Sequence, residues 1–296
     1  MSSLGDIYRF VLITLSIVLV AMLGGVFWRR ATGRALAPRP SYVAQPHPRT
    51  AAARFSDSFA GTSTIEETGT MTASLSPDWW LSSGGLMYIK NGSAQTVQGD
   101  LAADSKWRQK YAANNPTDTD NGRHPQNIFR LVTRSQFGQL NQEAYFRIES
   151  DELSASPQRN ASNGLLFFNR YQDEDNLYYT GLRVDGTAVI KKKIHGTYYT
   201  MAEKAVYPGQ YNHATSPNLL PKHTWIGLRS TVSTAVDGSV AVTLWSQQGG
   251  GAWQQLLEAH DDGRGFGGAP ITAAGHGGVR TDFMDVSFRD YSISEL

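Results

Sequence analysis

The 296-residue chain contains no cysteine. This absence excludes disulfide scaffolds, thiol nucleophiles and zinc sites built on cysteine. The chain also lacks an excess of charge of either sign, because 27 Lys and Arg residues stand against 26 Asp and Glu residues and leave a formal net charge of +1. Nucleic-acid-binding domains usually carry a clear basic excess, so this balance disfavours nucleic acid as a partner.

Long helical patterns are also scarce, whereas glycine and aromatic residues are abundant. The chain has 29 Gly, 7 Trp, 13 Tyr and 12 Phe residues. Glycine-rich turns between aromatic and β-branched runs are typical of an all-β domain. One segment, Leu101–Asn115, could form a short helix, but its polar, glycine-rich surroundings favour an irregular insertion.

One long apolar run departs from this composition. Phe10–Trp28 contains no charged residue, and as a helix it would be about 28 Å long, close to the hydrocarbon thickness of a bilayer. A cleaved signal peptide has a shorter apolar core with a small-residue cleavage site directly after it, whereas Arg29 and Arg30 follow this run. We therefore expect a transmembrane signal-anchor helix at residues 10–28, preceded by an N-terminal stub at residues 1–9.

The segment after this run, residues 29–53, is rich in proline and arginine and has almost no apolar periodicity. It predicts a semi-extended linker. More arginines follow the apolar run than precede it, so the positive-inside rule favours a cytoplasmic carboxyl-terminal domain. The domain type that residues 54–296 resemble is found mostly outside cells. We therefore expect the domain to be extracytoplasmic, although the arginine count favours the opposite orientation.

Period-two alternation predicts the strands of the remaining domain. Three segments alternate in this way, namely Ala144–Ser150, Asn176–Gly186 and Gly238–Ser246. Each is typical of a half-buried antiparallel strand, while Gly164–Tyr171 is apolar on both faces, as expected of a central strand. Turn sequences at Val184–Thr187 and Val236–Ser239 indicate hairpins.

Three consecutive lysines lie on the second strand of the hairpin that Asp185 and Gly186 close. Alternation places Lys191 and Lys193 on one face of the sheet and Lys192 on the other. A face that combines such cations with tyrosine rings suits an acidic glycan, because rings pack on sugar faces and cations pair with carboxylates or sulfates. The alternative is a solvated face that keeps the sheet soluble. The candidate ligand-binding residues are Tyr145, Arg147, Tyr179, Arg183, Lys191 and Lys193.

Several motifs occur in the order typical of one superfamily. They are "RFSDSFAG" at Arg54–Gly61, the strand and hairpin at Gly164–Ala202, "W-x-x-L-R" at Trp225–Arg229 and "F-x-D-x-x-I" at Phe288–Ile293. Together they resemble concanavalin A-like, laminin-G-like jelly rolls. The resemblance implies a β-sandwich of two stacked antiparallel sheets, one of them concave, with the first and last strands paired. It covers Arg54–Ile293 except Thr62–Gln126, and it does not determine an activity.

Two enzymatic activities occur on this fold. Its glycoside hydrolases use an alternating E-x-D-x-E pattern, which this chain lacks, so such hydrolysis is disfavoured. Alginate-lyase-type polysaccharide lyases use three motifs, and degraded matches occur in the same order at Arg134–Phe137, Lys193–His195 and Tyr207–Ala214. The matches are weakened because Gln136 replaces a glutamate and Lys193 replaces a glutamine. This alternative would give Arg134, His195 and Tyr211 catalytic roles.

Jelly rolls of this type often hold calcium near the paired terminal strands. Asp57 and Asp290 are the candidate ligands here, although both could instead cap turns. The sequence therefore predicts a membrane-anchored, extracytoplasmic β-sandwich that binds carbohydrate or another surface polymer without catalysis. The alternatives are a polysaccharide lyase acting on an acidic, uronate-containing glycan and a protein-binding adhesion or assembly module.

Overall fold

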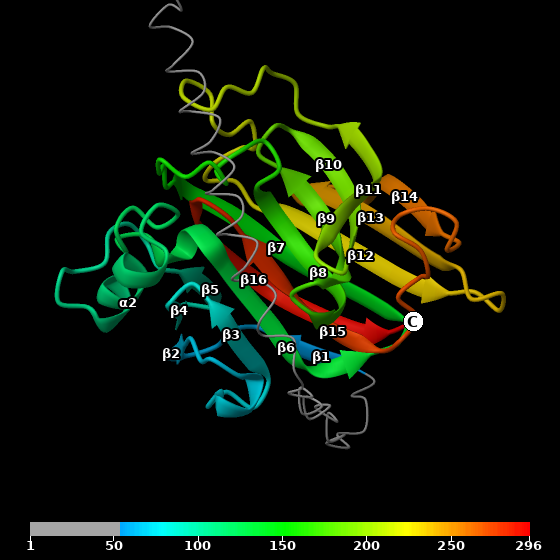
Figure 1. Ribbon diagram of the computed structural model, residues 1–296, viewed down its shortest axis with the longest axis horizontal. Coiled ribbons are helices and arrows are strands. Elements are labelled where there is room, and N and C mark those ends of the chain that lie inside the picture. The colour runs from blue at the N-terminus through cyan, green and yellow to red at the C-terminus, as the bar shows by residue number, and fades with distance from the viewer. Residues whose placement is uncertain (1–53) are drawn as a thin grey trace, which may run out of the picture. The chain divides into compact units, whose positions relative to one another are not determined.

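The computed structural model describes residues 54–296 (Figure 1). The predicted stub, signal anchor and linker, at residues 1–9, 10–28 and 29–53, lie outside the described residues. Within the described part of the chain, no helix is both long and apolar enough to cross a membrane. Strands dominate this part, as the composition predicted, and they form two sheets.

Sheet A contains nine strands in the order β14-β13-β12-β7-β16-β5-β4-β2, and β1 pairs with β16 off this path. The strands are β1 (Arg54–Asp57), β2 (Thr62–Glu66), β4 (Leu86–Lys90), β5 (Ser93–Thr96), β7 (Leu140–Asp151), β12 (Ile226–Thr234), β13 (Val240–Gln248), β14 (Gln254–Asp261) and β16 (Met284–Glu295). The first and last strands pair antiparallel, with Arg54 opposite Ser294, which confirms that expectation.

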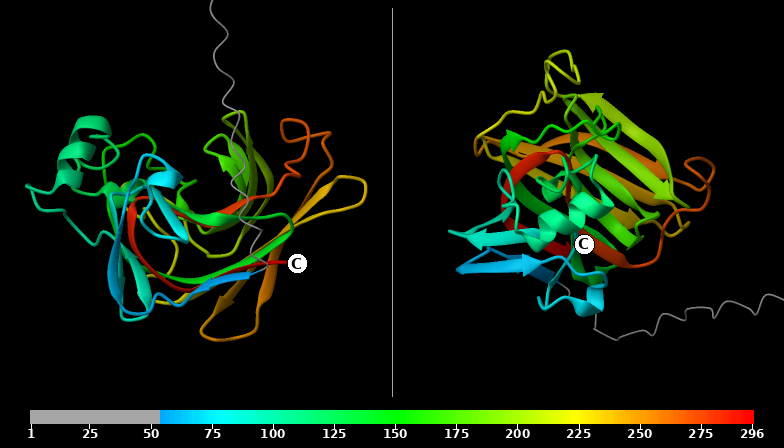
Figure 2. Two further views of the ribbon diagram at one scale, coloured as in Figure 1. Left: turned by 90° about the horizontal axis from the view of Figure 1, so that it is seen from below. Right: turned by 60° about the vertical axis from the view of Figure 1, so that its left-hand side comes forward.

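Sheet B contains seven strands in the order β11-β10-β9-β8-β15-β6-β3. The strands are β3 (Trp79–Ser83), β6 (Phe129–Phe137), β8 (Gly164–Asp173), β9 (Asn176–Arg183), β10 (Thr187–Ile194), β11 (Thr197–Ala205) and β15 (Gly275–Thr281). Every strand pair of this sheet is antiparallel. Both sheets are curved, and the hollow side lies on sheet B (Figure 2, left).

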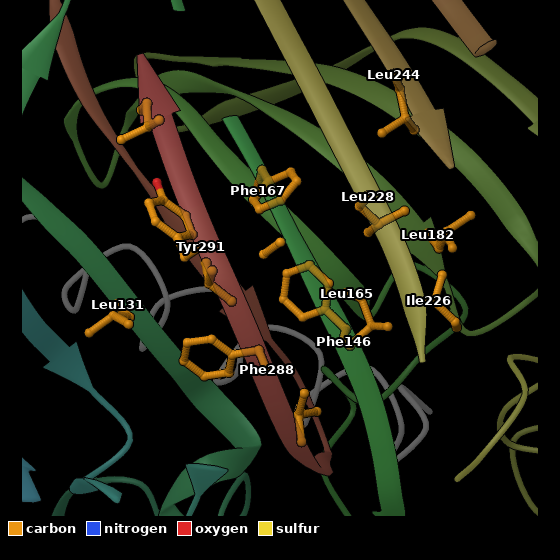
Figure 3. Packing of buried hydrophobic residues seen from close by; sticks show 14 of the residues in the cluster. Leu131, Phe146, Leu165, Phe167, Leu182, Ile226, Leu228, Leu244, Phe288 and Tyr291 are labelled. Carbon is orange, nitrogen blue, oxygen red and sulfur yellow. The ribbon is translucent and has the colours of Figure 1, made fainter. Parts of the chain in front are cut away.

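The main core lies between the two sheets, where the inward-facing side chains of the central strands are buried (Figure 3). Phe146 of β7 and Phe167 of β8 meet across the sandwich with ring centroids 5.5 Å apart. Phe288 of β16 packs beside Phe146 at 6.2 Å. Alternation of apolar and polar residues therefore determines which side of each strand faces the core, and the predicted β-sandwich is confirmed.

The segment Thr62–Gln126, for which the sequence offered no match, extends both sheets. It supplies β2, β4 and β5 to sheet A and β3 to sheet B. It also contains helix α2 (Lys106–Asn114), so the expectation of an irregular insertion was wrong. Ser105 caps this helix, because its hydroxyl accepts a hydrogen bond from the Trp107 amide. Trp107 and Tyr111 lie one turn apart and bury one face of the helix, which stabilises so short an element. Two 3₁₀ turns, η1 (Met71–Ala73) and η2 (Pro125–Ile128), complete this segment.

Candidate functional site

A groove of about 430 Å³ lies on the outer face of sheet B. Pockets of this size hold small ligands or short segments of a polymer. Leu166 of β8, Tyr179 of β9 and Val189 of β10 form its apolar floor. They point outward because each is next in sequence to a residue whose side chain enters the core, and they pack together as a second apolar cluster.

Two tyrosines stand side by side in this groove. Tyr179 is 4% exposed and lies in the floor, whereas Tyr198 of β11 is 47% exposed. Their ring centroids are 5.7 Å apart. The guanidinium of Arg280, from β15, lies 5.4 Å from the Tyr179 ring centroid, and its Nη1 donates a hydrogen bond to the Tyr198 hydroxyl at 3.4 Å. An arginine from β15, which is distant in sequence, thus contacts a phenol pair formed by β9 and β11.

The groove carries more positive than negative charge. Three cations line it, namely Arg130, Lys191 and Arg280, against two carboxylates, Asp118 and Asp282, so the difference is +1. Arg280 is paired with Asp282, with its Nε 2.9 Å from both carboxylate oxygens. Lys191 has no carboxylate within ion-pair distance among residues 54–296. Its ammonium is therefore available to an anionic ligand.

The surroundings shift the pKa of two groups in the groove. Burial lowers the pKa of Lys191, and the neighbouring Arg183 and Arg280 guanidiniums lower it further. Burial alone would raise the pKa of the Tyr198 phenol, but Arg280 and Lys193 outweigh it, and the pKa lies below its ordinary value. Burial raises the pKa of Tyr179, which stays a neutral phenol. Tyr198 is therefore the more acidic member of the pair.

Polar side chains form the walls of the groove. One wall comes from the loop before β8 and consists of Gln158, Asn160 and Ser162. Asp118, from the segment between α2 and η2, forms the other. The Ser156 hydroxyl donates to the Asp118 carboxylate, which joins the two walls. Amides and hydroxyls of this kind can both donate and accept hydrogen bonds, as recognition of sugar hydroxyls requires.

The six predicted ligand residues do not share one surface. Tyr179 and Lys191 line the groove. Arg183 and Lys193 face the same side, but both have partners: Arg183 is 2.5 Å from Asp185 and Lys193 is 3.2 Å from Asp175. The remaining two, Tyr145 and Arg147, lie on β7 of sheet A, so the six candidate residues are divided between two sheets. A ligand-binding role for these six residues stays a prediction.

The middle lysine points the other way, as alternation predicted. Lys192 is fully buried between the sheets, and its Nζ lies 2.8 Å from the equally buried Asp261 carboxylate at the end of β14. Its ammonium also donates to the carbonyl oxygens of Gly268 and Ala269, at 2.8 and 2.7 Å. The Tyr178 hydroxyl donates to the same carboxylate at 2.7 Å. This lysine is a structural residue.

The structure does not bring the three residues of the lyase alternative together. His195 lies at the β10–β11 turn, where its backbone amide donates to Asn176 at the start of β9. Tyr211 lines a small pocket with Val184, beyond the end of β9, roughly 25 Å away along that strand. Arg134 lies on β6, with β15, β8 and β9 between it and β10.

The calcium candidates have other contacts. Asp57 accepts hydrogen bonds from the Phe59 amide at 2.7 Å and from the Trp79 indole at 2.8 Å. Asp290 is exposed and lies 3.5 Å from the Arg289 guanidinium. Within residues 54–296, no group of three or more His, Asp or Glu side chains is arranged to hold a metal ion.

Sequence reasoning missed most residues of the groove, among them Arg130, Tyr198 and Arg280. Tyr198 could have been found, because it lies directly opposite Lys193 across the tight turn at His195 and Gly196. The two arginines could not be found, since β15 pairs with β6 and with β8, and both strands are distant from it in sequence.

No family model matches the chain, and no curated protein is significantly similar to it. Several solved structures resemble it at low identity. The carbohydrate-binding module CBM66 from Bacillus subtilis is 10% identical, with 73% of this chain and 95% of that chain covered and a TM-score of 0.46. The GH43 protein BlXynB from Bacillus licheniformis is 13% identical over 79% of this chain and 39% of its own, with a TM-score of 0.40. The alginate lyase Aly36B is 9% identical, with 82% and 97% covered and a TM-score of 0.39. These scores are low, so the functional proposal rests on the groove itself.

Proposed function

We propose that the protein is a membrane-anchored, concanavalin A-like β-sandwich that binds an acidic glycan in the groove of sheet B. The observation that supports this function is the unpaired Lys191 ammonium beside the Tyr179–Tyr198 pair. A tyrosine ring packs on the apolar face of a sugar, while an ammonium pairs with a carboxylate or sulfate on the same sugar. The amide-rich wall supplies partners for hydroxyl groups.

The anchor and the position of the domain belong to the same proposal. The apolar run at residues 10–28 would hold the chain in the membrane, and the linker at residues 29–53 would keep the groove away from the bilayer. A surface polymer as ligand requires the domain to lie outside the cytoplasm. Digestion of the domain by protease added to intact cells is the expected result, and complete protection in intact cells would contradict this orientation.

Affinity electrophoresis tests the binding function. The full-length chain, purified in mild detergent, would run through gels that contain alginate, polygalacturonate or neutral galactomannan. We expect an acidic polymer to retard the wild type, and Lys191→Ala to weaken that retention about tenfold, because a charge-assisted hydrogen bond is lost. Lys204→Ala is the matched control, since this lysine is exposed on β11 and does not line the groove. Equal mobility of wild type and Lys191→Ala in every acidic gel would contradict the proposal.

A second candidate, a polysaccharide lyase, is favoured by the position of Tyr198. A phenolate at Tyr198 could take the proton from the carbon next to a uronate carboxylate, while Lys191 and Arg280 stabilise the negative charge that develops there. The glycosidic carbon–oxygen bond then breaks as a carbon–carbon double bond forms, and the leaving oxygen takes up a proton. The pKa of this phenol lies below its ordinary value, as a base requires.

Absorbance of unsaturated uronate ends separates the two functions. A binding protein leaves the absorbance of an alginate or polygalacturonate solution unchanged. A lyase raises it, and Tyr198→Phe would then abolish the rise while retention in the acidic gel persists. Tyr88→Phe is the matched tyrosine control, because Tyr88 lies on β4 of sheet A and does not line the groove.

A further inference from the structure

The outer face of sheet A, on the far side of the sandwich from the groove, carries a second concentration of aromatic residues. Its members are partly exposed and come from β7, the residue before β12, β13 and the segment before β14: Tyr145, Trp225, Trp245 and Trp253. Aromatic residues at this density on an outer sheet face are not needed for the core. Trp and Tyr side chains left partly exposed together are typical of binding surfaces.

Arginine side chains alternate with these rings. The Arg289 guanidinium lies 4.5 Å from the Trp225 ring centroid and 5.8 Å from that of Tyr145. Tyr145 and Trp253 are 6.1 Å apart, and Arg229 lies 4.2 Å from the Trp253 ring. We call these contacting residues, Tyr145, Trp225, Trp253, Arg229 and Arg289, the aromatic–arginine ladder. Arg289, Tyr145 and Arg229 lie on three neighbouring strands, β16, β7 and β12.

A glycine lets the rings of the ladder lie close to the backbone. Gly227 on β12 sits opposite Tyr145 on β7. A Cβ atom at this position would lie 3.0 Å from both the Trp253 and the Tyr145 ring and 3.2 Å from the Gln247 side chain. The two rings therefore pack directly over the Gly227 backbone. The position of Tyr145 is fixed further by its hydroxyl, which donates a hydrogen bond to the Gln247 side chain at 2.6 Å.

The ladder has no surplus charge. Arg229 is 2.8 Å from Glu143, Arg289 is 3.5 Å from Asp290, and Arg147, which lies over Trp225, is paired with Glu149 at 2.8 Å. An anionic polymer would meet a carboxylate beside each of these arginines, which disfavours nucleic acid and acidic glycans. A neutral sugar ring meets aromatic surface and paired polar groups without a charge left unpaired. The ladder, with its balanced charges, therefore differs from the groove, which carries an excess of one positive charge.

We propose that the aromatic–arginine ladder is a second carbohydrate-binding surface, and that its ligand is a neutral polysaccharide. The paired guanidinium and carboxylate groups can exchange hydrogen bonds with sugar hydroxyls, and the rings stack on the apolar sugar faces. The two outer faces of the sandwich then select different polymers, one acidic and one neutral. This inference does not depend on the ligand of the groove.

Retention of the full-length chain in gels that contain hydroxyethyl cellulose or galactomannan tests the inference, with alginate as the comparison. We expect a neutral polymer to retard the wild type and Trp253→Ala or Trp225→Ala to weaken that retention about tenfold, the loss typical of an aromatic anchor. Alginate retention should stay unchanged in both variants, and Lys191→Ala should give the reverse pattern. Near-ultraviolet circular dichroism establishes that each variant is folded.

Three results would overturn the inference. The first is migration of the wild type unaffected by either neutral polymer. The second is retention that both tryptophan variants preserve. The third is a homodimer in light scattering that Trp253→Ala converts to a monomer, because the ladder would then be an interface between two copies of the chain.

Discussion

Replacing Lys192 by methionine should destabilise the domain far more than the same change at either neighbouring lysine. The side chain of Lys192 and the Asp261 carboxylate are both 0% exposed, and only 2.8 Å separates their charged atoms. Methionine fills a similar volume but leaves a buried carboxylate whose remaining partners are neutral, namely the Tyr178 hydroxyl and the Gly263 amide. Breaking a buried pair in this way costs about 3–5 kcal/mol of unfolding free energy, or roughly 6–20 °C in Tm for a domain of this size.

The adjacent lysines are matched controls. Lys193 pairs with an Asp175 that is 54% exposed, and such surface pairs contribute about 0–1 kcal/mol. Lys191 has no carboxylate partner within residues 54–296, so Lys191→Met should leave stability nearly unchanged. Urea unfolding followed by tryptophan fluorescence measures all three variants on one scale. The three consecutive lysines should thus give one large loss and two small ones.

A double variant decides whether the unpaired charge is the cause. Lys192→Met combined with Asp261→Asn removes both charges and keeps an acceptor for Tyr178, so it should recover most of the lost free energy. The reasoning is refuted if Lys192→Met unfolds within 1 kcal/mol of the wild type, on the scale of a surface pair. It is equally refuted if the double variant is no more stable than the single one, since the loss would then come from packing.

Three further predictions concern the groove and the insertion beside it. Retention by an acidic polysaccharide should fall as the pH rises, and the fall should begin below about pH 10. The reason is that Lys191 loses its positive charge, and Tyr198 gains a negative charge, at lower pH than the free side chains do. Retention that stays constant from pH 7 to 10 would contradict this prediction. Gly122→Ala should cost more than about 1 kcal/mol of stability, because its φ is +79° and a Cβ would lie 2.0 Å from the Arg108 carbonyl oxygen; a wild-type Tm would be the contrary result. Ser105→Ala should remove the cap of α2 and cost about 1 kcal/mol in urea unfolding, and an unchanged midpoint would argue that packing alone holds the helix.

Features that depend on one strand or one hairpin could be predicted from the sequence. Alternation assigned opposite faces to Lys191 and Lys192, and the turn at Val184–Thr187 joins β9 to β10 as expected. Both signals are local, because side-chain direction alternates along a strand and a tight turn sets the register of its two strands. The sandwich itself followed from many such strands with glycine-rich turns.

Features that depend on the order of strands in a sheet could not be predicted. Arg147 and Arg183 have similar alternating surroundings, but alternation does not say to which sheet a strand belongs. Arg130 and Arg280 reach the groove because β6 and β15 pair with each other and β15 pairs with β8, across long separations in sequence. No local pattern records these pairings. Helix α2 was missed for a related reason, since the apolar cluster of Val97 and Leu101 that buries its face forms only in the folded insertion.

The structure of the full-length chain with a short oligouronate bound tests the central claim most directly. The account predicts a uronate carboxylate within hydrogen-bond distance of the Lys191 ammonium and a sugar ring packed against Tyr198, in the groove of sheet B. An oligouronate bound at any other surface while the groove holds no sugar would contradict it.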